Sequence, residues 1–208
     1  ITPTKGIYTS AAVEFAGGFR TSAEKVVSLL GGDFRFLRLQ GNFRTYIPLG
    51  TPLVVLRWNL SLGYVKSLDG SVVPYTIRYR AGGINSIRGY LPYSVGPYFK
   101  WMSNDDPVHA AEGIVLGGNA SIINNLELEF PLVPPAGVKG VVFFDAGDAF
   151  GGLYGTDPFS FENLRLSTGF GIRWHSPMGP LRFEWGFPIN RRPHERDQVF
   201  EFTIGSFF

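Results

Sequence analysis

The sequence predicts an all-β fold, a transmembrane antiparallel β-barrel with eight strands in this chain. Three observations predict it. Apolar and polar residues alternate over long segments, glycine and aromatic residues are frequent while charged residues are few, and short connections alternate with long ones. A tilted strand needs about 9–11 residues to cross a bilayer, and its alternation turns apolar side chains to lipid and polar ones to the lumen.

The composition narrows the class of protein further. The 208 residues include 27 Gly, 19 Phe, 9 Tyr and 4 Trp, and charged residues make up 17% of the chain, against about 25% in an average soluble chain. The absence of cysteine excludes a disulfide scaffold, a thiol nucleophile and a cysteine-ligated metal. A net charge of +2 gives no electrostatic footprint for nucleic acid, and no apolar run is long enough for a membrane-spanning helix. No signal peptide opens the chain, so we expect that one has been removed or that the chain is part of a longer protein.

The alternation is clearest at 53–64, where Val54 and Leu56 share one face while Arg57 and Asn59 share the other. Seven further strands are predicted in the same way, with the weaker patterns at the first and fourth of these ranges: 6–16, 34–45, 114–130, 139–149, 165–175, 181–189 and 200–208. Charged residues gather on one face of these strands. A soluble sheet would turn that face to water, so alternation alone does not distinguish it from a membrane barrel.

The lengths of the connections favour the membrane barrel. Short connections at 46–52, 131–138 and 176–180 alternate with longer ones at 17–32, 65–112, 150–163 and 190–198. Outer-membrane barrels have short periplasmic turns and longer extracellular loops. We therefore expect a single barrel domain over 1–208, with the C-terminus on the periplasmic side and a long extracellular loop at about 65–112.

One motif within this long loop is specific. Residues 82–90 read Gly-Gly-Ile-Asn-Ser-Ile-Arg-Gly-Tyr, which resembles the Arg-Gly-Phe/Tyr loop motif of the BamA/TamA-type outer-membrane assembly proteins, a family of bacterial surface antigen barrels. Further stretches resemble segments of the same family in the same order: Gly117–Ala120, Leu126–Pro131, Phe143–Gly147, Gly169–Leu181 and Phe200–Phe208. The loop motif contributes the first candidate site residues: Gly82, Gly83, Arg88, Gly89 and Tyr90.

The resemblance implies that this loop folds back into the barrel lumen, where Arg88 pairs with carboxylates that motif position assigns to Glu127 and Asp145. The chemistry suits the pairing, because a guanidinium group is a planar fork of five donors that matches carboxylates. The alternative is that the three residues merely neutralise one another, as buried charges must. The other charges on the polar face are assigned to such ordinary pairing: Arg38, Arg44, Arg57, Arg165, Arg173, Arg182 and Glu184.

The resemblance also implies a function. In the family, outer-membrane proteins are inserted without any chemical reaction, because the seam between the first and last strands opens and a client strand pairs with the exposed edge. The C-terminal β-signal would comprise Phe200, Phe202, Ile204 and Phe208. We therefore expect no enzyme activity, no cofactor and no metal. The expected partners are the lipid bilayer of a Gram-negative outer membrane, outer-membrane protein clients and a second copy of the chain.

The number of strands leaves alternatives open. The family barrel has sixteen strands preceded by periplasmic POTRA domains, and this chain resembles the C-terminal eight-strand half, with no POTRA domain. A closed eight-stranded barrel is filled by its own side chains and has no room for the long loop. The chain is then half of a sixteen-stranded barrel, or one of two paired chains, or a closed barrel with the loop outside. The alternative functions are a passive structural barrel and a two-partner-secretion-type export pore.

Overall fold

A computed structural model of the chain describes residues 3–17, 35–100, 113–151, 164–177, 179–192 and 195–205. The elements in chain order are β1 (Gly6–Ala16), β2 (Phe36–Leu49), β3 (Thr51–Ser67), β4 (Tyr98–Lys100), β5 (Gly113–Val115), β6 (Ala120–Val133), the 3-10 turn η2 (Pro134–Ala136), β7 (Val138–Phe150), β8 (Arg165–Ser176), β9 (Gly179–Pro188) and β10 (Val199–Ile204). No helix in these ranges is long and apolar enough to cross a membrane.

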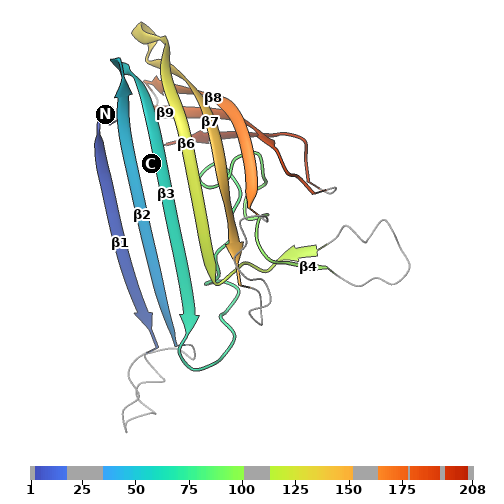
Figure 1. Cartoon of the computed structure of the whole chain (residues 1–208). Coiled ribbons are helices and arrows are strands. Elements are labelled where there is room, and N and C mark those ends of the chain that lie inside the picture. Colours follow the sequence, from blue (N-terminus) through green and yellow to red (C-terminus); the bar gives the residue numbers. More distant parts are fainter. Residues whose placement is uncertain are drawn as a thin grey trace.

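Eight strands form one antiparallel sheet in the order β1-β2-β3-β6-β7-β8-β9-β10, and β4 and β5 form a separate pair. The sheet curves, and the connection that follows β3 lies on its concave side (Figure 1). The tight β2–β3 and β6–β7 connections lie at the end of the sheet where the chain begins, and the long connection that follows β3 starts from the opposite end (Figure 1). For these three connections, the arrangement is the one that the sequence predicts.

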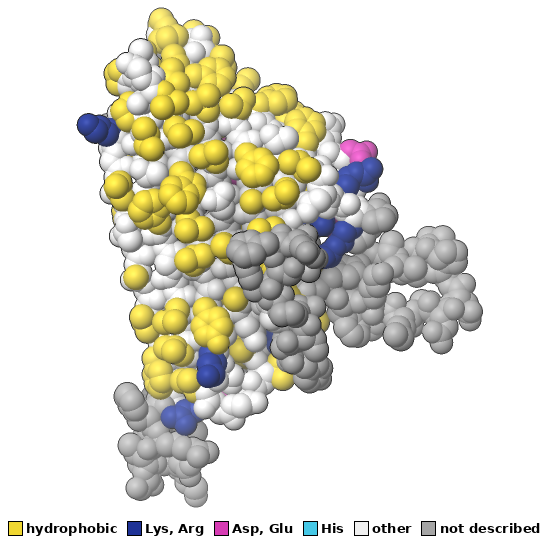
Figure 2. Space-filling model, in the orientation of Figure 1, with side chains coloured by type: hydrophobic (Ala, Val, Ile, Leu, Met, Phe, Trp, Pro, Cys, Tyr) yellow, Lys and Arg dark blue, Asp and Glu magenta, His cyan; other side chains and the backbone are white. Residues whose placement is uncertain are grey.

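Alternation along each strand separates a charged face from an apolar one. On β8, Ser167 and Arg173 are buried on the concave side, whereas Phe170 and Trp174 are exposed on the outer side. Every outward position of β8, β9 and β10 is uncharged. On the near side of the molecule, hydrophobic side chains spread over the strands while Lys and Arg lie toward the margins (Figure 2). Apolar outside and charged inside is the distribution of a membrane barrel wall.

Glycine and proline end the strands at the short connections. Gly50, with φ +73°, joins β2 to β3, and Gly137, with φ +69°, joins η2 to β7. Glycine adopts such left-handed angles without the penalty that a Cβ imposes. Pro134 begins η2, and proline has no N–H with which to continue a strand ladder.

Several boundaries differ from those expected, and β2 and β6 run on to Leu49 and Val133. The single strand expected at 114–130 is wrong, because the backbone turns at Gly117 (φ +73°) and divides the segment into β5 and β6. β4 lies inside the expected loop and pairs with β5, and β3 runs on to Ser67. The last strand ends at Ile204, and Phe208 lies outside the described residues.

The apolar core lies between the connection that follows β3 and the concave face of the sheet. One buried cluster consists of connection residues with Ile123 of β6 packed against it: Ala81, Ile87, Tyr90 and Val95. A second cluster joins Phe36 of β2 and Val65 of β3 to Val73 of the connection. The concave side of this wall is therefore occupied by the chain's own loop.

The two ends of the sheet are free edges. Among the described residues, β1 pairs only with β2 and β10 only with β9. The eight strands therefore do not form a closed ring within this part of the chain. The arrangement with a closed ring and the loop outside is not the one observed, because the loop is docked on the concave face.

Candidate functional site

The tip of the loop is a tight turn. Gly82 and Gly83 have φ of +102° and +93°, angles that L side chains rarely adopt. The N–H of Gly83 donates to the Tyr90 carbonyl at 2.9 Å, and the N–H of Ser86 donates to the Gly83 carbonyl at 2.9 Å. These bonds close residues 83–90 on themselves and present Arg88 to the wall.

Arg88 is buried and binds three carboxylates from three strands. Its Nε and Nη2 donate to the two oxygens of Asp145 on β7, both at 2.7 Å, and its backbone N–H donates to Asp145 Oδ2 at 3.0 Å. Its Nη1 donates to Glu127 on β6 at 2.5 Å and to Glu184 on β9 at 3.2 Å. The guanidinium carbon lies 3.6 Å from the ring centre of Phe143, a cation–π contact. The structure thus brings Arg88 together with both carboxylates that motif position assigns to it.

Glycines in the wall let the loop come close. A Cβ on Gly186 of β9 would overlap backbone atoms of Gly89 and Arg88, and a Cβ on Gly147 of β7 would overlap the Ile122 carbonyl of β6 and also press on Ile87 of the loop. Gly89 itself has φ +88° and faces Gly186. Backbone therefore packs on backbone here, which no larger residue permits.

The carboxylates around Arg88 are shared with two further arginines. Arg173 on β8 donates through Nη2 to Glu127 at 2.9 Å and to Glu184 at 3.1 Å. Arg182 on β9 holds Glu184 through two bonds, 2.7 Å from Nε and 2.8 Å from Nη2. Glu127 and Glu184 therefore each join the loop to the sheet.

Together these groups form a buried charged cluster, which we define as Arg57, Arg88, Arg173, Arg182, Glu127, Glu129, Asp145 and Glu184. Arg57 completes it through an ion pair of 2.9 Å with Glu129. Four positive and four negative groups balance, so the loop docks without leaving a net charge in the cluster. Buried ion pairs contribute little net stability, but losing one partner leaves a buried charge uncompensated and is strongly destabilising. The cluster therefore specifies where the loop sits.

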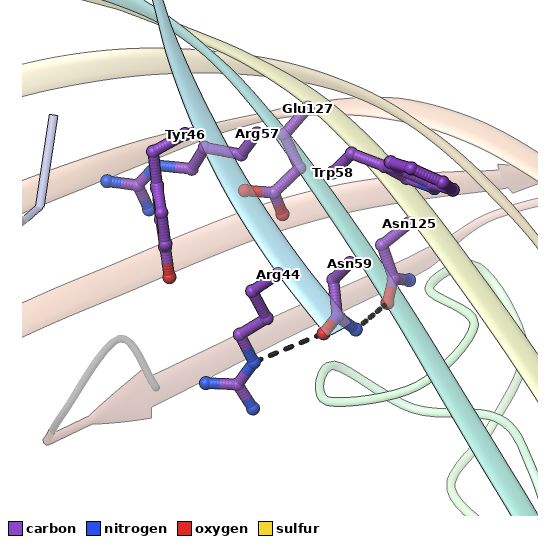
Figure 3. A pocket seen from close by; sticks show the side chains of 7 residues that line it. All are labelled: Arg44, Tyr46, Arg57, Trp58, Asn59, Asn125 and Glu127. Atoms are coloured by element: carbon purple, nitrogen blue, oxygen red, sulfur yellow. Dashed lines mark hydrogen bonds between the residues drawn. The ribbon is translucent and has the colours of Figure 1, made fainter. Parts of the chain in front are cut away.

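A pocket of about 30 Å³ adjoins the cluster, roughly the volume of one water molecule. It is lined by Arg44, Tyr46, Arg57, Trp58, Asn59, Asn125 and Glu127 (Figure 3). Arg44 Nε donates to Asn59 Oδ1 at 3.1 Å, and Asn59 Nδ2 donates to Asn125 Oδ1 at 2.9 Å. Asn125 Nδ2 in turn donates to Asp145 Oδ1 at 2.9 Å. These bonds connect β2 and β3 to the carboxylate that holds Arg88.

Tyr90, the last residue of the motif, fixes the other side of the loop. Its hydroxyl lies 3.0 Å from both the Leu166 carbonyl and Asn190 Oδ1, and either can accept its single proton. Burial raises the pKa of Tyr90 to about 12, so the phenol remains a donor further into the alkaline range than an ordinary tyrosine. Asn190 also accepts from the Leu166 N–H at 2.8 Å, so this contact joins the loop to the start of β8 and the end of β9.

Three charged residues that the sequence analysis assigned to ordinary ion pairing lie around the loop tip in the structure. Arg173 binds Glu127, Glu184 binds Arg88, and Arg182 in turn binds Glu184. Alternation had put them on the charged face, but a linear pattern does not reveal which strands face one another across a curved sheet. Other charges of that set pair elsewhere: Arg38 lies 3.7 Å from Glu14, and Arg165 pairs with Glu195.

The site offers binding and positioning groups. No cluster of three or more His, Cys, Asp or Glu able to hold a metal ion occurs in the part of the chain that the structure describes. The chemistry available is that of charge-paired docking between a loop and a barrel wall.

The fold and the site together define a class of protein: an antiparallel membrane-barrel wall whose inner face holds an arginine-bearing loop through buried carboxylates. The model of the Omp85 superfamily domain matches residues 1–208. The chain belongs to the Omp85 superfamily.

The chain is also similar in sequence to three named proteins. The chain is 34% identical, over 99% of its length, to the outer membrane protein assembly factor BamA of Nitratidesulfovibrio vulgaris, and covers 23% of that protein. It is 25% identical, over 96% of its length, to the protein of the same name from Neisseria meningitidis serogroup B, and covers 27% of it. It is 30% identical over 88% of its length to the chloroplastic outer envelope protein 80 of Arabidopsis thaliana, and covers 22% of it. The chain spans about a quarter of the length of these relatives.

A solved structure has the same fold. The crystal structure of BamA from Haemophilus ducreyi lacking POTRA domains 1–3 superposes with a TM-score of 0.73 at 26% identity, over 96% of this chain and 38% of that one. The expected all-β antiparallel fold and the resemblance to the BamA/TamA-type family are therefore confirmed.

Proposed function

We propose that this chain forms part of the wall of an outer-membrane β-barrel that assembles other outer-membrane proteins, and that client strands pair with the edge of β10. The names of two relatives, outer membrane protein assembly factor, support the role in assembly. The observation that carries the proposal is the free edge of β10 beside a loop that is fixed by buried charges.

The backbone of β10 identifies the groups that a client would meet. The N–H of Gly205 donates to the Pro180 carbonyl at 2.9 Å, so Gly205 faces β9. Residues of an antiparallel strand alternate between its two neighbours, and the register from 199 to 204 is continuous. The N–H groups at Phe200, Phe202 and Ile204 therefore point to the free edge. Strand addition at such an edge draws its affinity from main-chain hydrogen bonds.

The assembly role needs no chemical reaction. Insertion proceeds by exchange of backbone hydrogen bonds between strands. An unpaired strand edge in lipid has no water to bond to, so pairing with a client strand satisfies its N–H and C=O groups. We therefore propose a protein that acts without catalytic residues, cofactor or metal. The loop and its cluster keep the wall in one shape while the edge is exposed.

The outer membrane of a Gram-negative bacterium is the proposed location, with the short hairpins and the C-terminus on the periplasmic side. The charged concave face and the apolar outer face support the location. Because the chain has no cysteine, single cysteines at Gly50 and at Tyr75 can be labelled with an impermeant maleimide on intact cells. Labelling at Tyr75 and protection at Gly50 is the expected result, and the reverse pattern would contradict it.

The function is tested by the folding of an unfolded barrel client in liposomes that contain the protein. Wild-type protein and Phe202→Ala should accelerate client folding, whereas Phe202→Pro should not, because proline removes an edge N–H without removing a bond to β9. No acceleration by the wild type would leave a passive structural barrel. Steady single-channel conductance without acceleration would indicate an export pore.

A further inference from the structure

The tip of the loop contacts the edge strand as well as the middle of the sheet. The N–H of Ile84 donates to Glu201 Oε1 on β10 at 2.9 Å. The next two residues bind other strands: Asn85 Oδ1 accepts from Arg182 Nη1 on β9 at 3.4 Å, and the Ser86 carbonyl accepts from Asn125 Nδ2 on β6 at 2.6 Å. Three consecutive residues therefore join β6, β9 and β10.

Glu201 is the inward-facing side chain at the centre of β10. Its neighbours Phe200 and Phe202 are exposed on the outer face, and alternation turns Glu201 toward the loop. Within the residues that the structure describes, the strand pairs with β9 over six residues, the shortest pairing in the eight-stranded sheet. A hydrogen bond from a backbone N–H to a carboxylate is stronger than one between neutral groups, so it adds substantially to so short a ladder.

The register places a second carboxylate beside this bond. Glu201 lies directly opposite Glu184 on β9, and like charges that face one another across an antiparallel pair are destabilising. In the docked state Glu184 is neutralised by Arg88, Arg173 and Arg182. If the loop withdrew, Glu184 would lose Arg88 and with it part of this neutralisation. Glu201 would lose the N–H of Ile84 as its hydrogen-bond donor at the same time.

We propose that Glu201 is a positioning residue that couples the docked loop to the edge strand β10, so that loop and edge are held or released together. The loop is anchored by Arg88 in the charged cluster, and Glu201 transmits that anchoring to the edge. Coupling of this kind is reciprocal: freeing the edge loosens the loop, and freeing the loop loosens the edge. Its consequence for client pairing rests on the proposed function.

The coupling is tested by amide hydrogen exchange of the folded chain in liposomes, measured by NMR at two groups of sites. Gly205 reports on the β10–β9 ladder, and Gly83 and Arg88 report on the loop. Glu201→Ala should raise exchange at both groups about tenfold, equivalent to the loss of one hydrogen bond. Glu201→Gln retains a carbonyl oxygen as acceptor and should keep exchange at both groups near the wild-type rates.

Thr203→Ala is the matched control, because Thr203 faces the same side of the same strand two residues away. It should leave exchange at Gly83 and Arg88 unchanged. Faster exchange at Gly205 alone in Glu201→Ala, or equal loosening of the loop in Thr203→Ala, would overturn the coupling.

Client folding separates the two proposals: wild-type protein that shows the coupling but accelerates no client contradicts the proposed function only. Wild-type protein that accelerates clients while Glu201→Ala exchanges normally contradicts the coupling only.

Discussion

Arg88 gathers in one side chain the contacts that fix the loop tip. It binds Asp145, Glu127 and Glu184 while lying almost wholly out of solvent, with 2% of its surface exposed. Arg88→Ala leaves these carboxylates short of one positive charge, and breaking a buried pair from one side typically costs about 3–5 kcal/mol. We expect a decrease of that size in the free energy of unfolding, measured in urea in detergent micelles, with faster proteolysis of the loop.

Arg38→Ala is the matched control for this prediction. Arg38 also lies on the concave face and also contacts the loop, donating to the Tyr79 hydroxyl at 3.0 Å, but it is partly exposed and its carboxylate partner Glu14 is 3.7 Å away. Exposed pairs contribute about 0–1 kcal/mol, so the expected loss is smaller than for Arg88. Equal losses in the two variants, or a loop as resistant to protease in Arg88→Ala as in wild type, would contradict the role of Arg88. Arg88→Lys should rescue only part of the loss, because an ammonium group cannot bind both oxygens of Asp145 as a fork does.

The buried phenol of Tyr90 should make the stability of the fold depend on pH. Burial raises the pKa of Tyr90 to about 12, from about 10 in an unfolded chain. Because the folded-state pKa is the higher one, the stabilisation is fully present below about pH 10 and is lost as the pH rises through about 12. The difference in tyrosinate absorbance between wild type and Tyr90→Phe should titrate near pH 12. A midpoint near that of an ordinary tyrosine would show that Tyr90 is not buried by the wall.

At the scale of the element, β9 must approach the loop backbone directly. A Cβ at position 186 would overlap backbone atoms of Gly89 and Arg88, and backbone cannot rotate out of the way. Gly186→Ala should therefore destabilise the fold by about 1–3 kcal/mol, as overpacking does, and expose the loop to protease. Gly41→Ala on β2 is the control, because a Cβ there meets nothing within 4 Å. Equal effects in both variants would mean that the glycine matters only as a strand residue.

The strands could be predicted because the alternation of apolar and polar side chains is a property of neighbouring residues in the sequence. The alternation of β3, β8 and β9 is strict, and each strand was expected to within a few residues of its bounds. The division of 114–130 was missed because Ile114 and Leu116 continue the apolar period across the Gly117 turn. The small β4–β5 pair was missed because three-residue strands carry no detectable period.

The site could be predicted only where a motif marks it. Motif position assigned Glu127 and Asp145 as partners of Arg88, whereas Arg173, although it lies in the stretch Gly169–Leu181, and Glu184 were predicted only to share the charged face. Their meeting depends on the curvature of the sheet, which brings β6, β8 and β9 around one loop. The bond from Ile84 to Glu201 depends further on the path of the loop in space. Neither the curvature of the sheet nor the path of the loop can be read from the alternation of residues along the chain.

At the scale of the whole molecule, the two free edges determine what the chain can do in a membrane. Within the described residues β1 and β10 each have a neighbour on one side only. Unpaired backbone groups in lipid cost several kcal/mol each, so the edges must find partners: further strands, client strands or a second copy. The docked loop requires the wider lumen that additional strands provide, because an eight-stranded ring is filled by its own side chains.

The 208-residue chain on its own should therefore fold as a pair in detergent. The expected protein mass of the folded species, after subtraction of the micelle, is twice 23.0 kDa, about 46 kDa, measured by sedimentation equilibrium. Two walls of eight strands then close one lumen, and both loops keep their Arg88 contacts, so Arg88→Ala should weaken the pair as well as the fold. A mass near 23.0 kDa would mean that eight strands close alone. Arg88→Ala should then have little effect on that species, because a ring so narrow excludes the loop whose position Arg88 fixes.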